Sequence, residues 1–180
     1  LGRPIDRVAW PAGHDRLLQR GHAEGVVAAA LETGSLLLCY RRGYVTAFFD
    51  PGLYCPHTVS LATLVALDKY GDAPTRPWVE RLARRDDDRW QGATWMTEAG
   101  GGSDLGSGVE TRAVGAGSAW RLTGEKHFAS NAEAEIAVVA ARPVDGAPGV
   151  RGLALFAVPR RRGDGALNYR IRRLKDKIAT

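Results

Sequence analysis

Apolar positions in the first half of the chain recur with the period of an α-helix. In residues 15–32 the leucines and valines lie close to the 3.6-residue spacing of one helical face. Similar spacing recurs three times before residue 90. The predicted helices cover residues 15–32, 42–49, 58–69 and 78–85. The tripeptide Asp50-Pro51-Gly52 indicates a turn after the second of these helices.

The pattern changes near residue 90, where short apolar runs separated by glycine replace the helical spacing. Such runs, divided by turn sequences such as residues 115–118 and 145–149, are typical of β-strands. The predicted strands cover residues 92–97, 108–113, 120–123, 126–130, 136–141, 153–158 and 168–174. Because these strands do not alternate with helices, a doubly wound parallel sheet is disfavoured.

The order of the elements therefore predicts an α+β fold in two parts. We expect an N-terminal helical domain over residues 1–90 and a small antiparallel β-barrel or sandwich domain over residues 91–180. The last residues, 173–180, stop without a terminating turn or capping helix. We therefore expect the sequence to be an excerpt from a longer polypeptide.

Composition narrows the class of protein. The 180 residues are 44% hydrophobic and 25% charged, which excludes disorder of the whole chain. No apolar run reaches the roughly 18 residues of a membrane-spanning helix. Two cysteines, Cys39 and Cys55, cannot form a CxxC zinc or thiol motif, and the four histidines lack metal-ligand spacing. We therefore predict no metal site.

The net charge of +5 is concentrated near the end of the chain. Residues 151–180 contain nine Lys or Arg and two Asp. A basic segment of this kind binds a polyphosphate cofactor, another anionic ligand or a nucleic acid, or it forms a solvated face. The sequence leaves these alternatives open.

Residues 96–104, MTEAGGGSD, form the first candidate site. A predicted strand leads directly into three glycines, which let the backbone approach a ligand closely. Successive exposed N–H groups can form a nest for phosphate or another anion, and the hydroxyls of Thr97 and Ser103 can add hydrogen bonds. The alternative is a flexible connector between two strands. A Walker loop is excluded because no lysine follows the glycines in the required register.

Residues 124–131, GEKHFASN, form the second candidate site. Phe128 and Ser130 are two residues apart, so on the predicted strand their side chains face the same side. An aromatic ring beside a hydroxyl suits a planar heterocycle, which packs on the ring while a heteroatom meets the hydroxyl. The alternative is a core phenylalanine beside a surface serine.

Together these segments resemble the flavin-binding motifs of the acyl-CoA dehydrogenase family. MTEAGGGSD is similar to [LM]TE-x-x-x-GSD, and GEKHFASN is similar to G-x-K-x-[WF]-[IF]-[ST]-N. Three further matches follow in the family's order: a strand rich in Ala and Val at residues 135–141, then GLALFAVP at 152–159, and RLKDKIAT at 173–180. Five matches in order are far more specific than one.

Within the family the sequence is most similar to the AidB-type branch, through residues 50–60 and the glycines after MTE. Ala99 departs from the proline that most members have after the glutamate. The family fold has an N-terminal helical domain, a middle antiparallel β domain and a C-terminal helical bundle. The resemblance implies that this chain holds the end of the first domain and most of the second, and lacks the bundle.

The resemblance also implies FAD as the cofactor and a role for each motif residue. Thr97 would hydrogen-bond the isoalloxazine, and Ser103 would reach the pyrophosphate and the acyl thioester. Phe128 would lie against the ring, and Ser130 would lie near the reactive N5 edge. The full set of implied cofactor-binding residues is Thr94, Trp95, Met96, Thr97, Gly102, Ser103, Phe128, Ala129 and Ser130.

The implied reaction is α,β-dehydrogenation of an acyl thioester such as an acyl-CoA. A carboxylate removes the α-proton while the β-hydride passes to flavin N5. No residue here matches the family's catalytic glutamate, which lies in the bundle, so we expect this chain alone to be inactive. The family also implies a homotetramer, a cytoplasmic location, and electron-transfer flavoprotein or another acceptor.

Two other functions stay open on the same scaffold. The AidB-type branch suggests a DNA-associated flavoprotein with little dehydrogenase activity, which the basic segment near the end of the chain supports weakly. A third alternative is a different flavin reaction, such as amine oxygenation, which would need other residues in the bundle.

Overall fold

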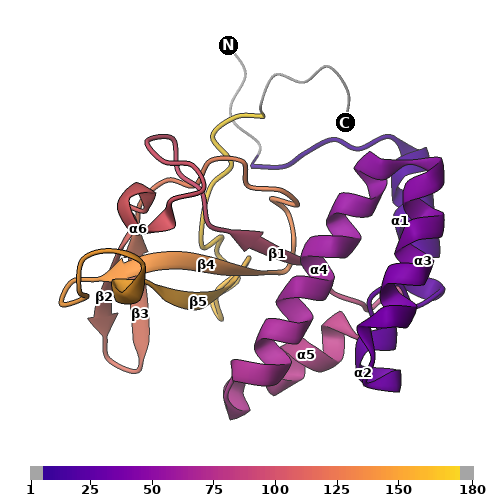
Figure 1. The fold of residues 1–180 in the computed structure, drawn as a ribbon, viewed down its shortest axis with the longest axis horizontal. Coiled ribbons are helices and arrows are strands. Elements are labelled where there is room, and N and C mark those ends of the chain that lie inside the picture. Colours follow the sequence, from indigo (N-terminus) through magenta and orange to yellow (C-terminus); the bar gives the residue numbers. More distant parts are fainter. Residues whose placement is uncertain (1–5, 175–180) are drawn as a thin grey trace.

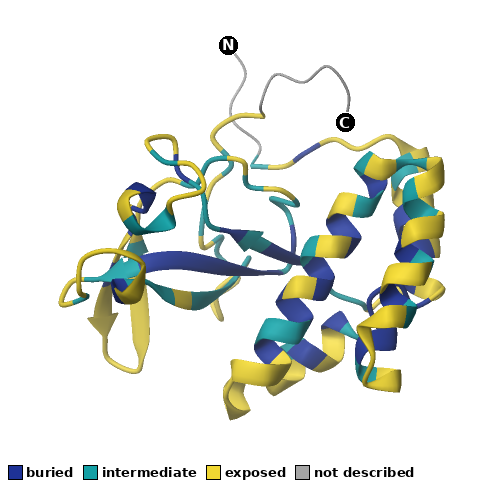
Figure 2. Cartoon of the chain, in the orientation of Figure 1, coloured by how far each residue is buried: buried dark blue, intermediate teal, exposed yellow. Residues whose placement is uncertain are grey.

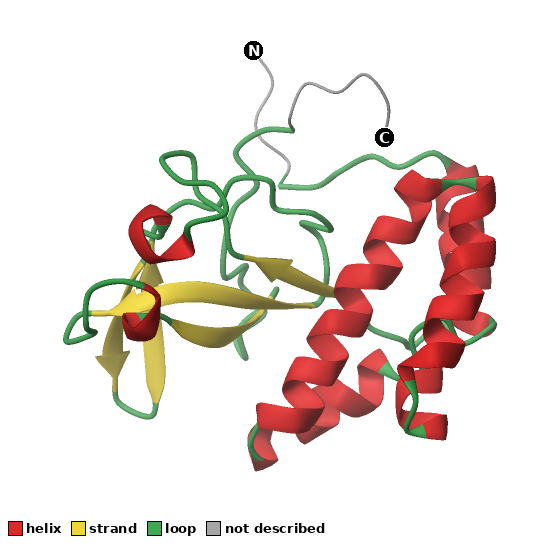
Figure 3. Ribbon diagram, viewed as in Figure 1, coloured by secondary structure: helices red, strands yellow, loops and turns green. Residues whose placement is uncertain are grey.

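Helices α1 to α5 lie on one side of the protein, and the strands, with the short helix α6 beside them, lie on the other (Figure 1). The structure, a computed structural model, describes residues 6–174. A group of helices comes first along the chain, and a sheet with its connecting loops follows (Figure 3). The predicted α+β order is therefore confirmed.

The helical part has one long helix and several shorter ones. Their bounds are α1 Ala12–Ala23, α2 Ala29–Thr33, α3 Leu36–Phe49, α4 Pro51–Tyr70 and α5 Arg76–Leu82, with a 3₁₀ turn at Ala73–Thr75. The helix expected over residues 15–32 is divided, because Gly25 has a φ of 74° that ends α1 and turns the chain. The expected turn at Asp50-Pro51 starts α4 instead: the Asp50 carboxylate accepts a hydrogen bond from the Leu53 amide at 3.1 Å.

The sheet has five strands among the described residues. They are β1 Gly92–Trp95, β2 Arg112–Ala116, β3 Ala119–Thr123, β4 Ile136–Pro143 and β5 Ala154–Pro159. The order is β1-β4-β2-β3, with β5 also paired to β4. β2 pairs antiparallel with β3, and β4 with β5, whereas β1 and β2 both run parallel to β4. The sheet is mixed, which corrects the expected antiparallel sheet, and over residues 6–174 it does not close into a barrel.

Two predicted strands do not form. Residues 126–130 make bends and a turn, and residues 168–174 run without regular structure. The strand expected at 108–113 begins only at Arg112, because a short helix, α6 (Leu105–Gly108), precedes it. A second 3₁₀ turn, Val150–Gly152, precedes β5. No helix within the described residues is long and apolar enough to cross a membrane.

Helix α4 packs directly on β1, and this contact joins the helices to the sheet (Figure 2). Leu64 and Leu82 from the helices and Ile136 from β4 belong to one apolar core and are fully buried. Ser60 and Gly92 hydrogen-bond across the contact, the amide of Gly92 donating to the Ser60 hydroxyl at 2.9 Å. β1 is thus held on one side by α4 and on the other by β4, which positions the residues that follow it.

Candidate functional site

The two candidate segments lie side by side at the end of β1. The carbonyl of Thr97 accepts a hydrogen bond from the amide of His127 at 2.9 Å. The Lys126 ammonium donates to the carbonyl of Met96 at 3.1 Å, and the Trp95 indole donates to the carbonyl of Ser130 at 2.9 Å. Three hydrogen bonds therefore connect β1 and the residues after it to a segment about 30 positions later in the sequence.

The second segment is a loop, so the argument from strand alternation was wrong. Phe128 has a φ of 55° and Asn131 a φ of 54°, both in the left-handed region that strands exclude. The amide of Ser130 donates to the carbonyl of Phe128 at 3.0 Å, which closes a tight turn. This turn brings Phe128 and Ser130 close together, and both residues are exposed. The ring of Phe128 is 60% exposed and meets His127 edge-on at 4.3 Å between centroids.

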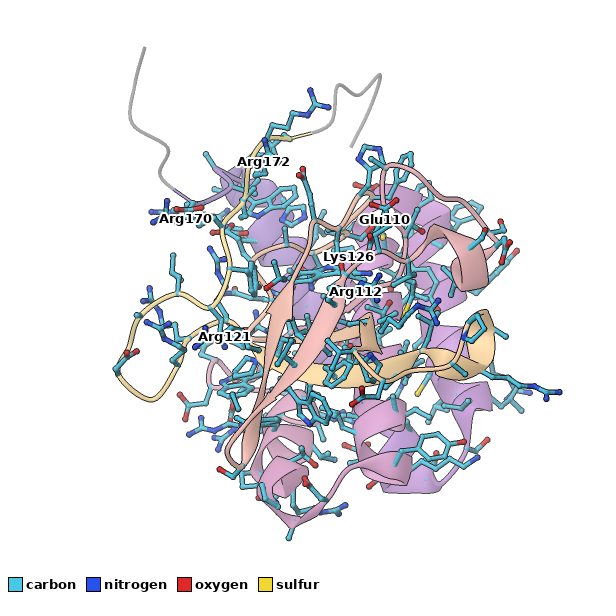
Figure 4. The ribbon with its side chains drawn as sticks, turned by 90° about the vertical axis from the view of Figure 1, so that its left-hand side faces the viewer. Glu110, Arg112, Arg121, Lys126, Arg170 and Arg172 are labelled. Atoms are coloured by element: carbon cyan, nitrogen blue, oxygen red, sulfur yellow. The ribbon has the colours of Figure 1, made fainter. Side chains whose placement is uncertain are left out.

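Glu98 directly follows Thr97, but its side chain is buried and hydrogen-bonded within the protein. Its carboxylate accepts hydrogen bonds from the Lys126 ammonium at 2.6 Å, the Thr111 hydroxyl at 2.5 Å and the Glu110 amide at 2.8 Å. Burial alone would raise the pKa of Glu98, but these hydrogen bonds outweigh it and hold that pKa below its usual value. Glu98 therefore stays ionised. It connects the end of β1 to the open end of the β2–β3 hairpin, where Glu110, before β2, and Lys126, after β3, lie close together (Figure 4).

The glycine segment folds against α6. A Cβ on Gly101 would come within 2.5 Å of the Gly108 Cα, so this position requires glycine for close backbone packing. A Cβ on Gly102 would meet nothing within 4 Å, and Ser103 beside it is exposed. The Asp104 carboxylate accepts from the Gly106 amide at 3.0 Å and begins α6. The segment is therefore an ordered turn in which Gly101 packs against α6 and Gly102 has free space around it.

The other predicted site residues divide by burial. Trp95, the last residue of β1, is buried, whereas Thr94, Met96 and Ala129 are half-buried. The structure thus brings Thr97 together with the loop that carries Phe128, Ala129 and Ser130. Within residues 6–174 no hydrogen bond joins Ser103 or Gly102 to that loop.

Four of the predicted residues, Gly102, Ser103, Phe128 and Ser130, form the exposed face of the candidate site, and Thr97 is half-buried. One hollow of about 750 Å³ lies beside α6 and includes Arg112 and Arg142 in its wall, and another of about 400 Å³ lies between α1 and α3. Neither hollow is lined by Thr97, Phe128 or Ser130.

The chemistry of this face fits a flat, polar-edged cofactor such as a flavin. It presents an exposed aromatic ring at Phe128 and, at Gly102, a backbone position with open space. Within residues 6–174 the hydroxyls of Thr97, Ser103 and Ser130 make no hydrogen bond to protein, so they remain available to a ligand. Aromatic side chains combined with a few polar groups such as hydroxyls are typical of the sites that bind cofactors.

The sequence alone did not indicate the residues that stabilise the backbone of the candidate site. The Tyr169 hydroxyl lies 3.1 Å from the carbonyl of Ala132 and 3.3 Å from that of Ala134, in the chain just after Ser130. Tyr169 falls in the segment expected to be a strand, and nothing in the local pattern indicates this contact. The interaction of Lys126 with Glu98 was also missed, although both residues lie within the matched motifs.

Comparison with known proteins identifies the family. Residues 93–180 match the family model described as "Acyl-CoA dehydrogenase, middle domain". Acyl-CoA dehydrogenase family member 11 from Caenorhabditis elegans is 33% identical to the chain over 99% of its length. The chain belongs to the acyl-CoA dehydrogenase family. The matched region contains all the predicted site residues, and the last motif, at residues 173–180, lies largely outside the described residues.

A second curated relative supports the predicted branch. The putative acyl-CoA dehydrogenase AidB of Escherichia coli (strain K12) is 29% identical over 98% of the chain. The chain spans about a third of the length of these curated relatives, 32% of the first and 34% of the second. It therefore corresponds to one part of an acyl-CoA dehydrogenase family protein.

Solved structures agree with the family and the fold. The structure of Caenorhabditis elegans ACDH-11 in complex with C11-CoA superimposes with a TM-score of 0.76 at 31% identity, covering 98% of this chain and 32% of that one. Glutaryl-CoA dehydrogenase from Mycobacterium smegmatis in complex with FADH2 gives 0.64 at 26% identity, covering 80% of this chain and 37% of that one. The helices and the open mixed sheet are thus a known arrangement within this family.

Proposed function

We propose that this chain is the part of an FAD-dependent acyl-CoA dehydrogenase-type oxidoreductase that carries one wall of the flavin site. The observation that carries the proposal is the direct contact between Thr97 and the loop that holds the exposed residues Phe128 and Ser130. Family membership and the relatives named as acyl-CoA dehydrogenases support the same reaction class. The ACDH-11 complex supports an acyl-CoA as the substrate.

FAD, when bound, supplies the hydride acceptor for α,β-dehydrogenation of the acyl thioester. The chain's own residues bind and orient it: Phe128 would pack on the ring, while Thr97 and Ser130 would donate hydrogen bonds to its polar edge. Gly102 and Ser103 would approach the pyrophosphate, and Ser103 would also contact the substrate. The complex of the Mycobacterium smegmatis enzyme with FADH2 supports this choice of cofactor.

Two observations support the expectation that this part is inactive alone. Phe128 and Ser130 are exposed to solvent. The Glu98 carboxylate is already hydrogen-bonded to Lys126 and Thr111. We propose that a helical bundle elsewhere in the polypeptide covers the face and supplies the carboxylate base. We also propose that residues 1–90 and 91–180 are separate domains, and that the full protein is a cytoplasmic homotetramer with a flavoprotein electron acceptor.

The decisive experiment is to purify the full-length protein and record its flavin spectrum. We expect the purified protein to contain FAD. We also expect at least one acyl-CoA thioester, from a panel of straight, branched and aromatic ones, to bleach the flavin absorbance. Absence of flavin would contradict the proposed cofactor. Bound flavin that no thioester reduces would contradict the proposed substrate.

Removal of two hydroxyls tests the site itself. We expect Thr97→Ala combined with Ser130→Ala to raise the dissociation constant of FAD roughly 30-fold, because each lost hydrogen bond costs about 1 kcal/mol. FAD content after gel filtration and a titration of the apoprotein measure the effect. The double variant Thr46→Ala/Thr58→Ala is the control, since both of its hydroxyls bond to carbonyls within their own helices. Equal FAD affinity in the two double variants would refute the assignment.

A DNA-associated flavoprotein is the second candidate function, favoured by the relative named AidB and by the exposed arginines near residue 170. Two basic groups of this region are already engaged, since Arg172 pairs with Glu125 and Arg162 with Asp164. The candidate predicts DNA binding by the full-length protein that falls steeply with salt. Absent or salt-insensitive binding would exclude it.

A further inference from the structure

The loop that carries Phe128 and Ser130 has a backbone shape that it would not hold by itself. Phe128 and Asn131 both have φ near +55°, and only asparagine adopts that region readily. A bulky residue in the left-handed region costs free energy and persists only where surrounding contacts impose it. The contacts that impose the shape of this loop therefore control where Phe128 and Ser130 lie.

Two contacts from distant parts of the chain hold this loop: the Asn131 amide side chain donates to the carbonyl of Gly92 at 2.9 Å, and Tyr169 contacts it from near the end of the chain. The Tyr169 hydroxyl lies within hydrogen-bond distance of two loop carbonyls, at 3.1 Å from that of Ala132 and 3.3 Å from that of Ala134. Burial raises the pKa of Tyr169 to about 12, although the nearby Arg160 opposes the rise. The hydroxyl therefore keeps its proton and remains a donor throughout the physiological range of pH.

The Tyr169 ring is itself held firmly. Trp95 meets it edge-on with 4.8 Å between ring centroids, and the Arg160 guanidinium lies 4.7 Å from the ring centre. Arg160 also donates to the Tyr169 carbonyl at 3.4 Å and to the carbonyl of Asp6. Trp95 also donates a hydrogen bond to the carbonyl of Ser130. The two aromatic side chains therefore bind the loop backbone at three carbonyls: Trp95 at Ser130, and Tyr169 at Ala132 and Ala134.

We infer that Tyr169 is a positioning residue for the flavin-facing loop. It acts through the loop backbone, and with Trp95 it holds Phe128 and Ser130 beside Thr97 in the arrangement that the cofactor would meet. Tyr169 is half-buried and its hydroxyl contacts backbone carbonyls of the loop, whereas Phe128 and Ser130 are exposed. This inference rests on the proposed function as far as the ligand is FAD, whereas the control of the loop by Tyr169 does not depend on the ligand.

The test is Tyr169→Phe in the full-length protein, which keeps the ring and removes only the hydroxyl. We expect amide hydrogen exchange in residues 130–135 to accelerate roughly tenfold and the dissociation constant of FAD to rise roughly tenfold. We also expect the visible bands of bound flavin to shift, because the ring would meet a displaced Ser130 and Phe128. A merely structural role for Tyr169 would lower stability without moving these bands.

The matched control is Tyr54→Phe, the same deletion at a half-buried tyrosine of α4 in the helical part. We expect it to leave loop exchange, FAD affinity and the flavin bands unchanged. If Tyr169→Phe fails to fold, Trp95→Phe removes the other donor to the loop and should show the same three effects.

The outcomes separate this inference from the proposed function. Loop exchange and FAD affinity within twofold of wild type in the Tyr169→Phe protein would overturn the inference and leave the proposed cofactor standing. A wild-type protein that binds no FAD would overturn the proposed cofactor. In that protein, faster loop exchange in Tyr169→Phe than in Tyr54→Phe would still support the control of the loop by Tyr169, and equal exchange would refute it.

Discussion

Glu98 shows how a residue inside a ligand-binding motif can serve the scaffold. It follows Thr97 directly, yet its side chain turns inward and is only 7% exposed. Lys126, which is 9% exposed, is its cation partner, and Thr111 adds a hydroxyl and an amide. The motif therefore combines a residue that faces a ligand with one that fixes the backbone carrying it.

Loss of the buried ion pair between Glu98 and Lys126 should lower the stability of the folded state. We expect Lys126→Met to destabilise the folded state by about 3 kcal/mol, because it leaves the Glu98 carboxylate buried without a cation. The control is Arg172→Met, which removes the exposed partner of Glu125 and should cost less than about 1 kcal/mol. Thermal and urea unfolding of the full-length proteins measure both. Equal stability of the two variants would show that the pair is not important.

Lys126→Met should also change how the stability of the folded state depends on pH. The folded-state pKa of Glu98 is lowered, so its stabilising contribution is complete above the unfolded-state pKa and disappears as pH falls through the folded-state value. Without Lys126 the folded-state pKa rises, and the loss should begin at a higher pH. Unfolding midpoints between pH 7 and pH 4 report this shift.

His22 belongs to the scaffold as well. Burial, and then the neighbouring His57 and Arg89, lower the pKa of His22 to about 3, so its ring is neutral near pH 7. Its ring lies 4.9 Å from that of His57, and within residues 6–174 neither of its nitrogen atoms has a hydrogen-bond partner. These two histidines pack the helical part, far in the fold from the predicted flavin face.

At the scale of elements, the glycine segment is defined by its contact with α6. Gly101 and Gly108 approach through their backbones, so neither position has room for a side chain. From the sequence alone the three glycines were equally compatible with a flexible connector. The packing distinguishes them, since one supports the helix and one faces open space.

Alanine substitutions should separate these glycines. We expect Gly101→Ala to destabilise the protein by about 1–3 kcal/mol, because the new methyl group would overlap the backbone of α6. Gly102→Ala meets no atom within 4 Å and should leave stability within about 1 kcal/mol, although it should still weaken FAD binding if the pyrophosphate approaches there. Melting temperatures together with FAD titrations measure both effects. Similar losses of stability at the two positions would contradict the packing argument.

At the scale of the whole molecule, the helical part and the sheet share one contact surface. Thr63 and Ser60 of α4 hydrogen-bond to Ala93 and Gly92 of β1, and the apolar core extends from the helices to β4. A Cβ on Gly92 would lie 2.5 Å from the Thr63 Cβ, so only glycine allows helix and strand to come this close. The proposed domain boundary at residue 90 therefore lies beside a tightly packed contact.

Loss of one hydroxyl at this contact should loosen β1. We expect Ser60→Ala to cost about 1–3 kcal/mol, because the buried Gly92 amide would lose its acceptor. Hydrogen exchange of the β1 amides, and FAD retention by the adjoining site, should both report the change. Thr58→Ala, at an exposed position of the same helix, is the control. Unchanged exchange in β1 after Ser60→Ala would show that the contact does not hold the strand.

Local patterns were sufficient for the order of elements and for the family. Helical periodicity and glycine-bounded apolar runs are properties of neighbouring residues, as are the two motifs that contain Thr97 and Phe128, so they can be read without a fold. The direction of strand pairing, the turn at residues 126–131 and the role of Tyr169 depend on groups that are distant along the chain. Such contacts depend on how the packed chain satisfies its buried polar groups and fills its core, and no short stretch of sequence carries that information.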